Sequence, residues 1–347
     1  MKMAVSRLGW RTVRWLLVMA FAFNSSGAVR AAEVAVKSGQ TIAFLGDSIT
    51  EGGWGNPVGY VRLVLAGLAA NGVSVEGIPA GISGHKSDQM LARLELHVLS
   101  KHPDWMTLSC GVNDVWHGKN GIPLDQYKSN LTEIVTRAQA AKVQVMILTA
   151  TVIGEELDNE NNRKLAPYND FLRALAREKH CLLADLNADF QARLKPAAAA
   201  NPKPGLLLTS DGVHMNLAGD KLMAAGILRA FGLDAAQIKK AEDAWLDIPD
   251  AVTLRGVVAT TNNQRSLKAS WRITLRQREK LETYAVGEKK PLDALAQEIF
   301  DQELKALLKP AGEYASVDAI YEAKKNREAQ AQLTDRFGKR ITELLAK

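Results

Sequence analysis

Length, composition and charge narrow the classes of protein to which this chain can belong. Its 347 residues are 47% hydrophobic and 24% charged, and the formal net charge is +6. Five basic residues and no acidic ones lie within residues 1–32, so +6 less five leaves about +1 for the rest of the chain. So small a charge gives no reason to expect nucleic acid or an acidic substrate as a partner.

The first 32 residues have the composition of a secretion signal. Basic residues precede a run of nine apolar residues, 15–23, and the small residues that follow offer cleavage sites after Ala28 or Ala31. Nine apolar residues are too few to span a bilayer, although an uncleaved N-terminal anchor is the alternative. No other segment is long and apolar enough to be transmembrane. We therefore predict export to a periplasm or beyond it, with no stable membrane insertion after cleavage.

Predicted strands and helices alternate between residues 41 and 232. Strands are expected at 41–46, 73–80, 105–110, 143–150 and 181–186, and helices near 58–71, 87–100, 124–141, 162–179 and 216–231. The strands are short apolar runs, which is typical of a sheet covered on both faces. The alternation predicts a three-layer α/β/α fold with a doubly wound, parallel five-stranded sheet. Residues 195–205 are predicted to form a loop.

The two cysteines are predicted to remain unpaired. Cys110 is expected to end the third strand and Cys181 to begin the fifth. Opposite ends of a parallel sheet lie much farther apart than the ~5.5 Å Cα separation of a disulfide. We therefore expect two free, mostly buried thiols.

The segment Gly-Asp-Ser-Ile-Thr at 46–50 is the first candidate for a catalytic element. It follows the apolar run 41–45, and the carboxyl ends of parallel strands are where such sheets build their sites. Gly46 can adopt backbone angles that other residues resist, which would let the chain turn sharply and display Ser48. The alternative is that Asp47 or Ser48 only caps the helix that follows.

Three later segments complete a recognisable pattern. Residues 81–84 are Gly-Ile-Ser-Gly, residues 110–114 are Cys-Gly-Val-Asn-Asp, and residues 210–214 are Ser-Asp-Gly-Val-His. In this order along the chain they resemble the SGNH/GDSL hydrolase family, which is named for its Ser, Gly, Asn and His. The resemblance covers roughly residues 41–232. It implies a flavodoxin-like fold and a serine esterase or lipase, that is, a carboxylic ester hydrolase.

The resemblance also implies roles for individual residues. Ser48 would be the nucleophile, His214 the base that removes its proton, and Asp211 the acid that orients the imidazole. The backbone N–H groups of Ser48 and Gly84 and the side-chain amide of Asn113 would form the oxyanion hole. Taken singly, Asp211, Gly84 and Asn113 could be turn or loop residues and His214 a helix-start residue.

Several residues near these segments are secondary candidates for roles in the site. Asp47 and Asp114 are expected to support the loops, and Asp185 is a rival acid that nothing ties to a histidine. The site could be lined by Trp54, His85, Trp116 and His117, because aromatic rings suit sugars; plain packing or surface placement is the alternative. No His, Cys, Asp or Glu cluster has metal-binding spacing, so we expect neither a metal nor an organic cofactor.

The composition changes near residue 234. We predict a signal peptide at 1–32, a catalytic domain at 33–233 and a mainly helical extension at 234–347. Asp234 could cap a helix to about 246. Residues 248–250, a β-prone patch and residues 261–264 then suggest irregular structure, and apolar residues recur at helical spacing over 292–308 and 333–345. Residues 270–275 and the stretches after them loosely resemble ribbon-helix-helix DNA-binding proteins. Export makes DNA an implausible partner, and a lid or a self-association element is the preferred interpretation.

The sequence therefore predicts an exported serine esterase that acts through an acyl-enzyme on Ser48. Export and the family's carbohydrate acetylesterases favour a short acyl group, such as acetate, on a small-molecule or polysaccharide ester. The alternatives are a lysophospholipase or thioesterase of the same family, and a catalytically silent binding or scaffold protein that kept the fold.

Overall fold

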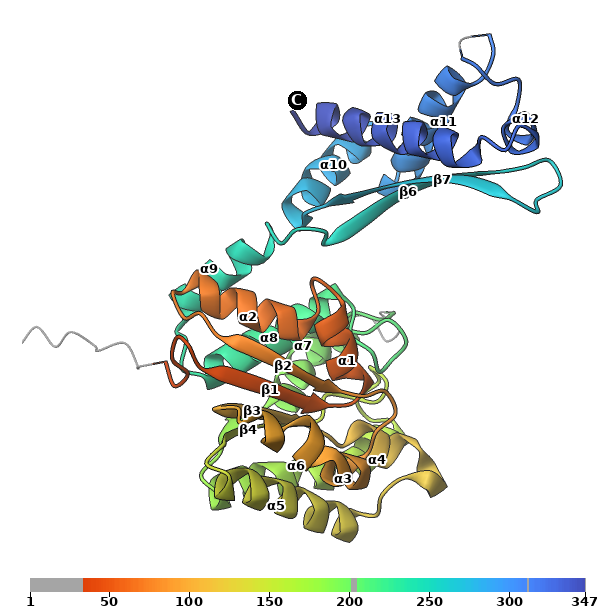
Figure 1. Ribbon diagram of the computed structural model, residues 1–347. Helices are drawn as coiled ribbons and strands as arrows, with labels where there is room; N and C mark the ends of the chain where they lie inside the picture. The colour runs from red at the N-terminus through yellow and green to blue at the C-terminus, as the bar shows by residue number, and fades with distance from the viewer. Residues whose placement is uncertain (1–33, 201–204, 311, 347) are drawn as a thin grey trace, which may run out of the picture. The chain divides into compact units, whose positions relative to one another are not determined.

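A parallel five-stranded sheet forms the centre of the structure. The computed structural model describes residues 34–200, 205–310 and 312–346, and the predicted signal peptide lies outside them. The strands are β1 (Thr41–Gly46), β2 (Glu76–Gly81), β3 (Trp105–Ser109), β4 (Gln144–Leu148) and β5 (Leu182–Ala184). They are ordered β2-β1-β3-β4-β5, of which Figure 1 labels the first four, and all their pairings are parallel. This is the flavodoxin-like order, so the predicted doubly wound sheet is confirmed.

Helices cover both faces of this sheet (Figure 1). One layer contains α2 (Tyr60–Ala70), α7 (Leu186–Ala200), α8 (Leu217–Ala230) and α9 (Ala235–Trp245). The other contains α3 (Ser87–His97), α5 (Leu124–Ala140) and α6 (Glu160–Glu178). Two short helices, α1 (Ser48–Gly55) and α4 (Val112–Trp116), and the 3-10 turns η1 (Leu99–Lys101) and η2 (Gly118–Asn120) complete this part.

Alternate residues of β1, β3, β4 and β5 enter two separate hydrophobic cores. Ile42 and Phe44 of β1 pack into the core beneath α2 and α8. Ala43 and Leu45 of the same strand pack into the core beneath α3 and α5. Since both faces of the sheet are buried, the strands need no polar side, which explains their continuous apolar sequences.

The predicted loop at 195–205 is wrong in its first half. Helix α7 continues to Ala200, and residues 201–204 lie outside the described chain. Leu186, Phe190 and Leu194 recur every four residues and are buried against the sheet. The alanines that follow have the highest helix propensity of any residue, so the helix extends through a stretch that its prolines made look like a loop.

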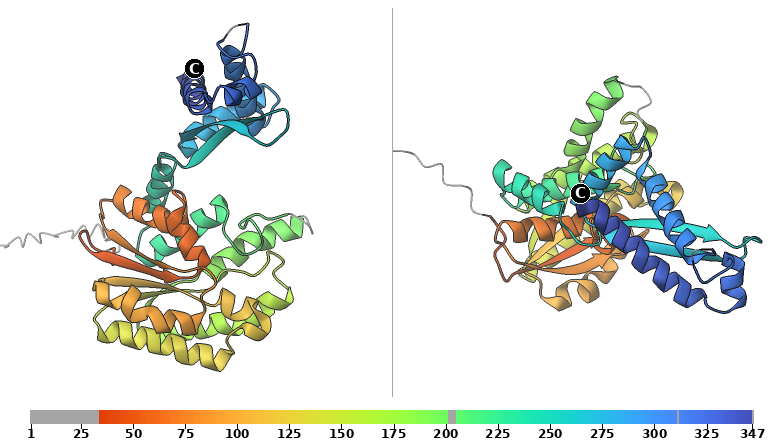
Figure 2. Two further views of the ribbon diagram at one scale, coloured as in Figure 1. Left: turned by 45° about the vertical axis from the view of Figure 1, so that its right-hand side comes forward. Right: turned by 90° about the horizontal axis from the view of Figure 1, so that it is seen from above.

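The C-terminal part is mainly helical, as predicted, but it also contains a β-hairpin. Strands β6 (Val252–Ala259) and β7 (Ser266–Ile273) pair antiparallel. The helices are α10 (Leu275–Gly287), α11 (Leu292–Leu307), α12 (Val317–Glu322) and α13 (Asn326–Ala346). The blue helices α11 and α13 pack on one face of the cyan hairpin (Figure 2) and enclose a core of their own.

The expectation of irregular structure over 248–264 is therefore wrong for residues 252–259, where the β-prone patch forms β6. Burial alternates along β6: Leu254 and Gly256 are buried, whereas Arg255 and Val257 are exposed. A period of two is a strand signal. A glycine within a strand weakens this sequence signal. Glycine is nevertheless needed at position 256, because a Cβ there would overlap the ring of Phe300.

Both cysteines are free, as predicted, with β4 lying between their strands. Cys110 is buried, whereas Cys181 is partly exposed rather than mostly buried. Among the described residues, no helix combines the length and the hydropathy needed to cross a membrane.

Candidate active site

Ser48 lies where β1 passes into α1. Asp47 is the N-cap of this helix, and its Oδ1 accepts a hydrogen bond of 3.0 Å from the backbone N–H of Ile49. The chain can turn so tightly because Gly46 has no Cβ, which would collide with the side chain of Thr50. Gly46 is therefore required for space rather than for the unusual backbone angles predicted from the sequence, since its φ is not positive.

His214 and Asp211 form a chain of hydrogen bonds that ends at Ser48. The Nε2 of His214 lies 2.9 Å from the Ser48 Oγ, and its Nδ1 lies 2.7 Å from the Asp211 Oδ2. The other carboxylate oxygen of Asp211 accepts the backbone N–H groups of Val213 and His214, at 2.9 and 2.8 Å. Ser48 and His214 are 166 positions apart in the sequence. The fold nevertheless brings them together with Asp211 in the arrangement of a nucleophile, a base and an acid.

The ionisation of Asp211 fixes how the imidazole is protonated. Burial opposes the charge of Asp211, but the hydrogen bonds from the side chain and backbone of His214 and from Val213 outweigh it, and the pKa falls to about 2. An ionised carboxylate can only accept, so the neutral ring carries its proton on Nδ1. The Nε2 lone pair is then free to accept the Ser48 hydroxyl proton.

The three predicted oxyanion donors come from the ends of three neighbouring strands. Ser48 follows β1, Gly84 follows β2 and Asn113 follows β3. Within the described chain no acceptor is bonded to the backbone N–H of Ser48 or Gly84. Gly84 has a φ of +76°, which strains any residue with a Cβ. The Asn113 side chain is buried, and its Nδ2 makes two long contacts, 3.2 Å to the His85 carbonyl and 3.4 Å to Asp47.

Asp47 and Asp114 both lie beneath these loops. Asp114 accepts the N–H and the hydroxyl of Ser87, at 3.0 and 2.6 Å, which ties α4 to the start of α3. Burial raises the pKa of Asp114, and burial together with the nearby Asp114 raises that of Asp47 to about 6. These contacts agree with the supporting role predicted for both.

The four residues predicted to line the site are placed differently. The Trp116 ring packs edge-on to His214, with centroids 6.5 Å apart, and 45% of the residue is exposed. His117 contacts the Asn113 Oδ1 at 3.2 Å. His85 accepts a bond from Arg93 at its Nδ1, and burial and the charge of Arg93 lower its pKa. Trp54 instead stacks on Arg62 and lies against Gly77 at the opposite end of β2.

Comparison with known proteins identifies the family. The sequence matches the GDSL-like lipase/acylhydrolase family over residues 44–222, which is just over half of the chain. The chain belongs to this family. It is therefore a carboxylic ester hydrolase, and the matched segment contains every residue of the candidate site.

Individual relatives narrow the comparison. An acetylxylan esterase of Geobacillus stearothermophilus is 28% identical over 221 residues, which are 57% of this chain and 97% of the relative. A crystal structure of the acetyl xylan esterase AlAXEase is 34% identical with a TM-score of 0.51, covering 55% of this chain and 98% of the other. A crystal structure of Axe2, an acetylxylan esterase from Geobacillus stearothermophilus, is 27% identical with a TM-score of 0.52. The match covers 58% of this chain and 97% of the other.

The sequence did not reveal that Arg93 braces this GDSL-family site. Its guanidinium is buried and donates to the carbonyls of Gly46 and Ala80, both at 2.8 Å, and to His85 at 3.0 Å. It thereby joins the end of β1 to the end of β2. Its partners lie up to 47 positions away, so no local pattern signals it.

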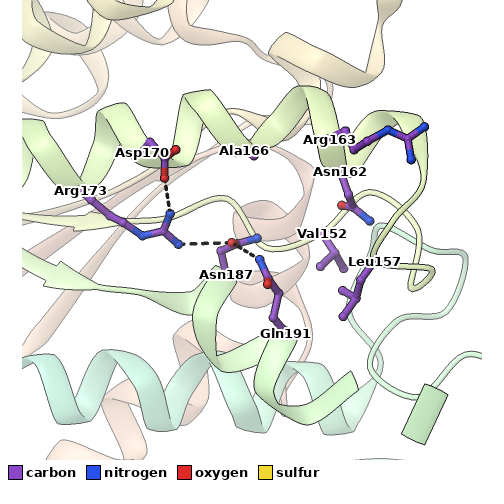
Figure 3. Close-up of a pocket in the computed structure, with 9 residues that line it drawn as sticks. All are labelled: Val152, Leu157, Asn162, Arg163, Ala166, Asp170, Arg173, Asn187 and Gln191. Carbon is purple, nitrogen blue, oxygen red and sulfur yellow. Dashed lines mark hydrogen bonds and ion pairs between the residues drawn. The ribbon is translucent and has the colours of Figure 1, made fainter. Parts of the chain in front are cut away.

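Asp185, the rival acid, belongs to a separate cluster. Its carboxylate accepts two bonds from Arg173, at 2.8 and 2.9 Å, and one of 3.0 Å from Thr149. Next to this cluster lies a pocket of about 290 Å³ (Figure 3), lined by Val152, Leu157, Asn162, Arg163, Ala166, Asp170, Arg173, Asn187 and Gln191. Arg173 and Asn187 bond to each other and to their neighbours. Within the described residues, no group of three or more His, Cys, Asp or Glu could hold a metal ion.

Proposed function

We propose that this GDSL-family hydrolase removes acetyl groups from a carbohydrate through an acyl-enzyme on Ser48. The observation that carries the proposal is the hydrogen-bonded chain from Asp211 through His214 to Ser48. The acetylxylan esterases among its relatives support acetate as the acyl group and a sugar as the alcohol. The exposed Trp116 beside His214 supports the same choice, because an aromatic face stacks well on a sugar ring.

The reaction follows from the positions of these groups. Ser48 Oγ attacks the ester carbonyl while its proton passes to the Nε2 of His214, and Asp211 stabilises the imidazolium that forms. The carbonyl oxygen becomes negative and receives hydrogen bonds from the N–H groups of Ser48 and Gly84 and from the Asn113 amide. Collapse of this intermediate breaks the bond to the alcohol, which takes the proton from His214. Water, activated by His214, then releases acetate from Ser48.

The test is a ladder of p-nitrophenyl esters from acetate to palmitate, followed by acetylated xylo-oligosaccharides. We expect turnover to peak at acetate and Ser48→Ala to abolish it without changing the thermal unfolding. Ser100→Ala is the matched control, because that serine is exposed and bonds only to the Leu96 carbonyl.

Each other result points to a different function. A peak at long chains would favour the lysophospholipase or thioesterase alternative. No turnover and no labelling of Ser48 by a fluorophosphonate would favour the silent scaffold. Unchanged turnover in Ser48→Ala would remove Ser48 from the mechanism.

The site of action is a further part of the proposal. The basic and apolar residues at 1–23 support export, to a periplasm or beyond it. An exported esterase would meet polysaccharides outside the cell. Fractionation of cells that express the full chain, with N-terminal sequencing of the product, tests this: cleavage after Ala28 or Ala31 is expected, and an intact cytoplasmic product would contradict it.

A further inference from the structure

The segment that presents Asp211 and His214 has little regular structure of its own. Residues 205–216 lie between α7 and α8 and form a single isolated bridge, from Thr209 to Met215. The turn is closed by bonds of its own, such as that from the Ser210 N–H to the His214 carbonyl at 2.8 Å, but its place in the fold must be set by contacts from elsewhere. The largest set of such contacts ends on one side chain, Glu155, in the loop that follows β4.

Glu155 accepts four hydrogen bonds from three consecutive residues. Its Oε2 accepts the N–H of Leu207 at 2.6 Å. Its Oε1 accepts the N–H of Leu208 at 2.8 Å, and both the N–H and the hydroxyl of Thr209 at 2.7 Å. Hydrogen bonds to a charged acceptor are about twice as strong as neutral ones. This carboxylate thus fixes the backbone immediately before the Asp211–His214 turn.

Thr209 carries the constraint into the turn itself. Its hydroxyl donates to Glu155 and accepts the N–H of Gly212 at 3.1 Å. The neighbouring Gly154 adds a direct backbone bond, from its N–H to the carbonyl of Gly212, at 2.7 Å. Gly212 lies between Asp211 and His214, so both contacts act on the residue that sets their separation.

The loop that holds Glu155 is itself anchored to the start of α6. Asn162 accepts the N–H of Ile153 at 2.8 Å and donates to the carbonyl of Gly154 at 2.9 Å. Asn159 donates to the carbonyl of Ile153 at 2.8 Å. Figure 3 shows Asn162 on the helix beside Val152, the first part of this loop. Hydrogen bonds therefore fix the backbone next to Glu155 to the start of α6, and Glu155 in turn fixes residues 207–209.

We infer that Glu155 is a positioning residue, which holds Asp211 and His214 at the distance from Ser48 that proton transfer requires. The inference rests on the proposed function. Glu155 makes no hydrogen bond to Ser48, His214 or Asp211 in the described chain, so it acts through the backbone of residues 207–209 and through the Thr209 hydroxyl. Its substitution should therefore slow the chemical step and leave substrate binding nearly unchanged.

Glu155→Gln tests this inference. The substitution keeps the size of the side chain, but its amide brings two N–H donors to a position that faces the three backbone N–H groups of residues 207–209 and the Thr209 hydroxyl. The neighbouring Glu156→Gln is the matched control, since Glu156 is exposed and only its carbonyl is bonded. We expect kcat per fluorophosphonate-titrated site to fall about 10–100-fold in Glu155→Gln, the cost of misplacing a reacting group by an ångström or less. KM for p-nitrophenyl acetate should stay within about twofold.

A second pair of variants separates positioning from folding. Thr209→Val removes the hydroxyl that joins Glu155 to Gly212, whereas Thr209→Ser keeps it. We expect the former to lower kcat per titrated site and the latter to retain it. Losses that come only from fewer titratable sites, or equal kcat per site in Glu155→Gln and Glu156→Gln, would overturn the inference.

Ser48→Ala, measured in parallel, keeps the two proposals apart. If Ser48→Ala loses turnover while Glu155→Gln keeps the kcat per titrated site of the wild type, only the positioning role is rejected. Unchanged turnover in Ser48→Ala rejects the proposed function and the positioning role with it.

Discussion

Three carboxylates near the site ionise differently because their surroundings differ. Asp211 is partly exposed and accepts three hydrogen bonds from His214 and Val213, and its pKa is about 2. It therefore remains charged at any pH at which the enzyme would be assayed. Burial raises the pKa of Asp47 to about 6 and that of Asp220 to about 7. The folded protein thus takes up protons at Asp47 and Asp220 in a pH range where the unfolded chain does not.

Asp220 offers the clearer test of this effect on stability, because it lies outside the triad. Its Oδ1 accepts the N–H of Tyr60 at 2.8 Å. Since its pKa rises from 3.8 to about 7 on folding, the folded state loses stability as pH rises through that window. The loss is at most on the order of 4 kcal/mol. Asp220→Asn keeps an acceptor and cannot ionise, so its advantage in thermal stability over the wild type should grow between pH 4 and 8.

Differential scanning calorimetry across that range measures the advantage. Asp125→Asn is the control, because its side chain is almost fully exposed and pairs only with Lys128. A constant difference between Asp220→Asn and the wild type at all pH values would contradict the burial of a titrating carboxylate.

The elements next to the site were the hardest to predict. The five strands of the sheet and the long helices other than α7 were found because each is a sustained apolar or amphipathic pattern. Helices α1 and α4 are only 8 and 5 residues long, and α1 contains three glycines, so neither shows a helical period. Both begin at the end of a strand and carry a site residue, Ser48 or Asn113. The residues were found through their motif, whereas the local structure that presents them was not.

The junction of β1 and α1 can be tested with two glycines. A Cβ at Gly46 would overlap Thr50 and lie 3.3 Å from the Ser109 carbonyl. We expect Gly46→Ala to destabilise the protein by about 1–3 kcal/mol, as overpacking does, and to lower turnover because Ser48 would shift.

Gly52→Ala is the control for that junction. Gly52 lies in the same helix, and its added Cβ meets nothing within 4 Å. This substitution should be neutral or stabilise by up to about 1 kcal/mol. Urea unfolding followed by fluorescence measures both, and equal midpoints for the two variants would contradict the close approach seen here.

At the scale of the whole molecule, the boundary after the hydrolase part is better judged from packing than from composition. The sequence predicted a catalytic domain at 33–233. Helix α9 follows that limit, yet Trp245 is fully buried in the core of α2 and α8, and its indole N–H donates to the Leu63 carbonyl at 2.8 Å. Long-range contacts of this kind, like those of Arg93 and Glu155, have no local signature. The packing favours a limit near 250.

Two truncated chains distinguish these limits. A chain that ends at Asp250 should keep the turnover of the full chain, because it loses no residue of the candidate site. It does lose the buried Leu275 from the core of α2 and α8, and exposed ion pairs such as Arg276 to Asp247, which contribute little. A chain that ends at Leu233 should be less stable by at least about 3 kcal/mol, since it loses the buried Trp245. Thermal unfolding and p-nitrophenyl acetate turnover measure both. If the two chains were equally stable, the domain limit at residue 233 predicted from the sequence would hold.

The long sequence separation between Ser48 and His214 also orders events during synthesis. Under the proposed mechanism Ser48 is made early and its base follows 166 positions later, so a growing chain would expose Ser48 before His214 could activate it. Turnover can begin only once residue 214 has emerged and folded back onto the end of β1. Labelling of Ser48 by an activity-based probe would therefore report that the segment with His214 has folded back onto the end of β1.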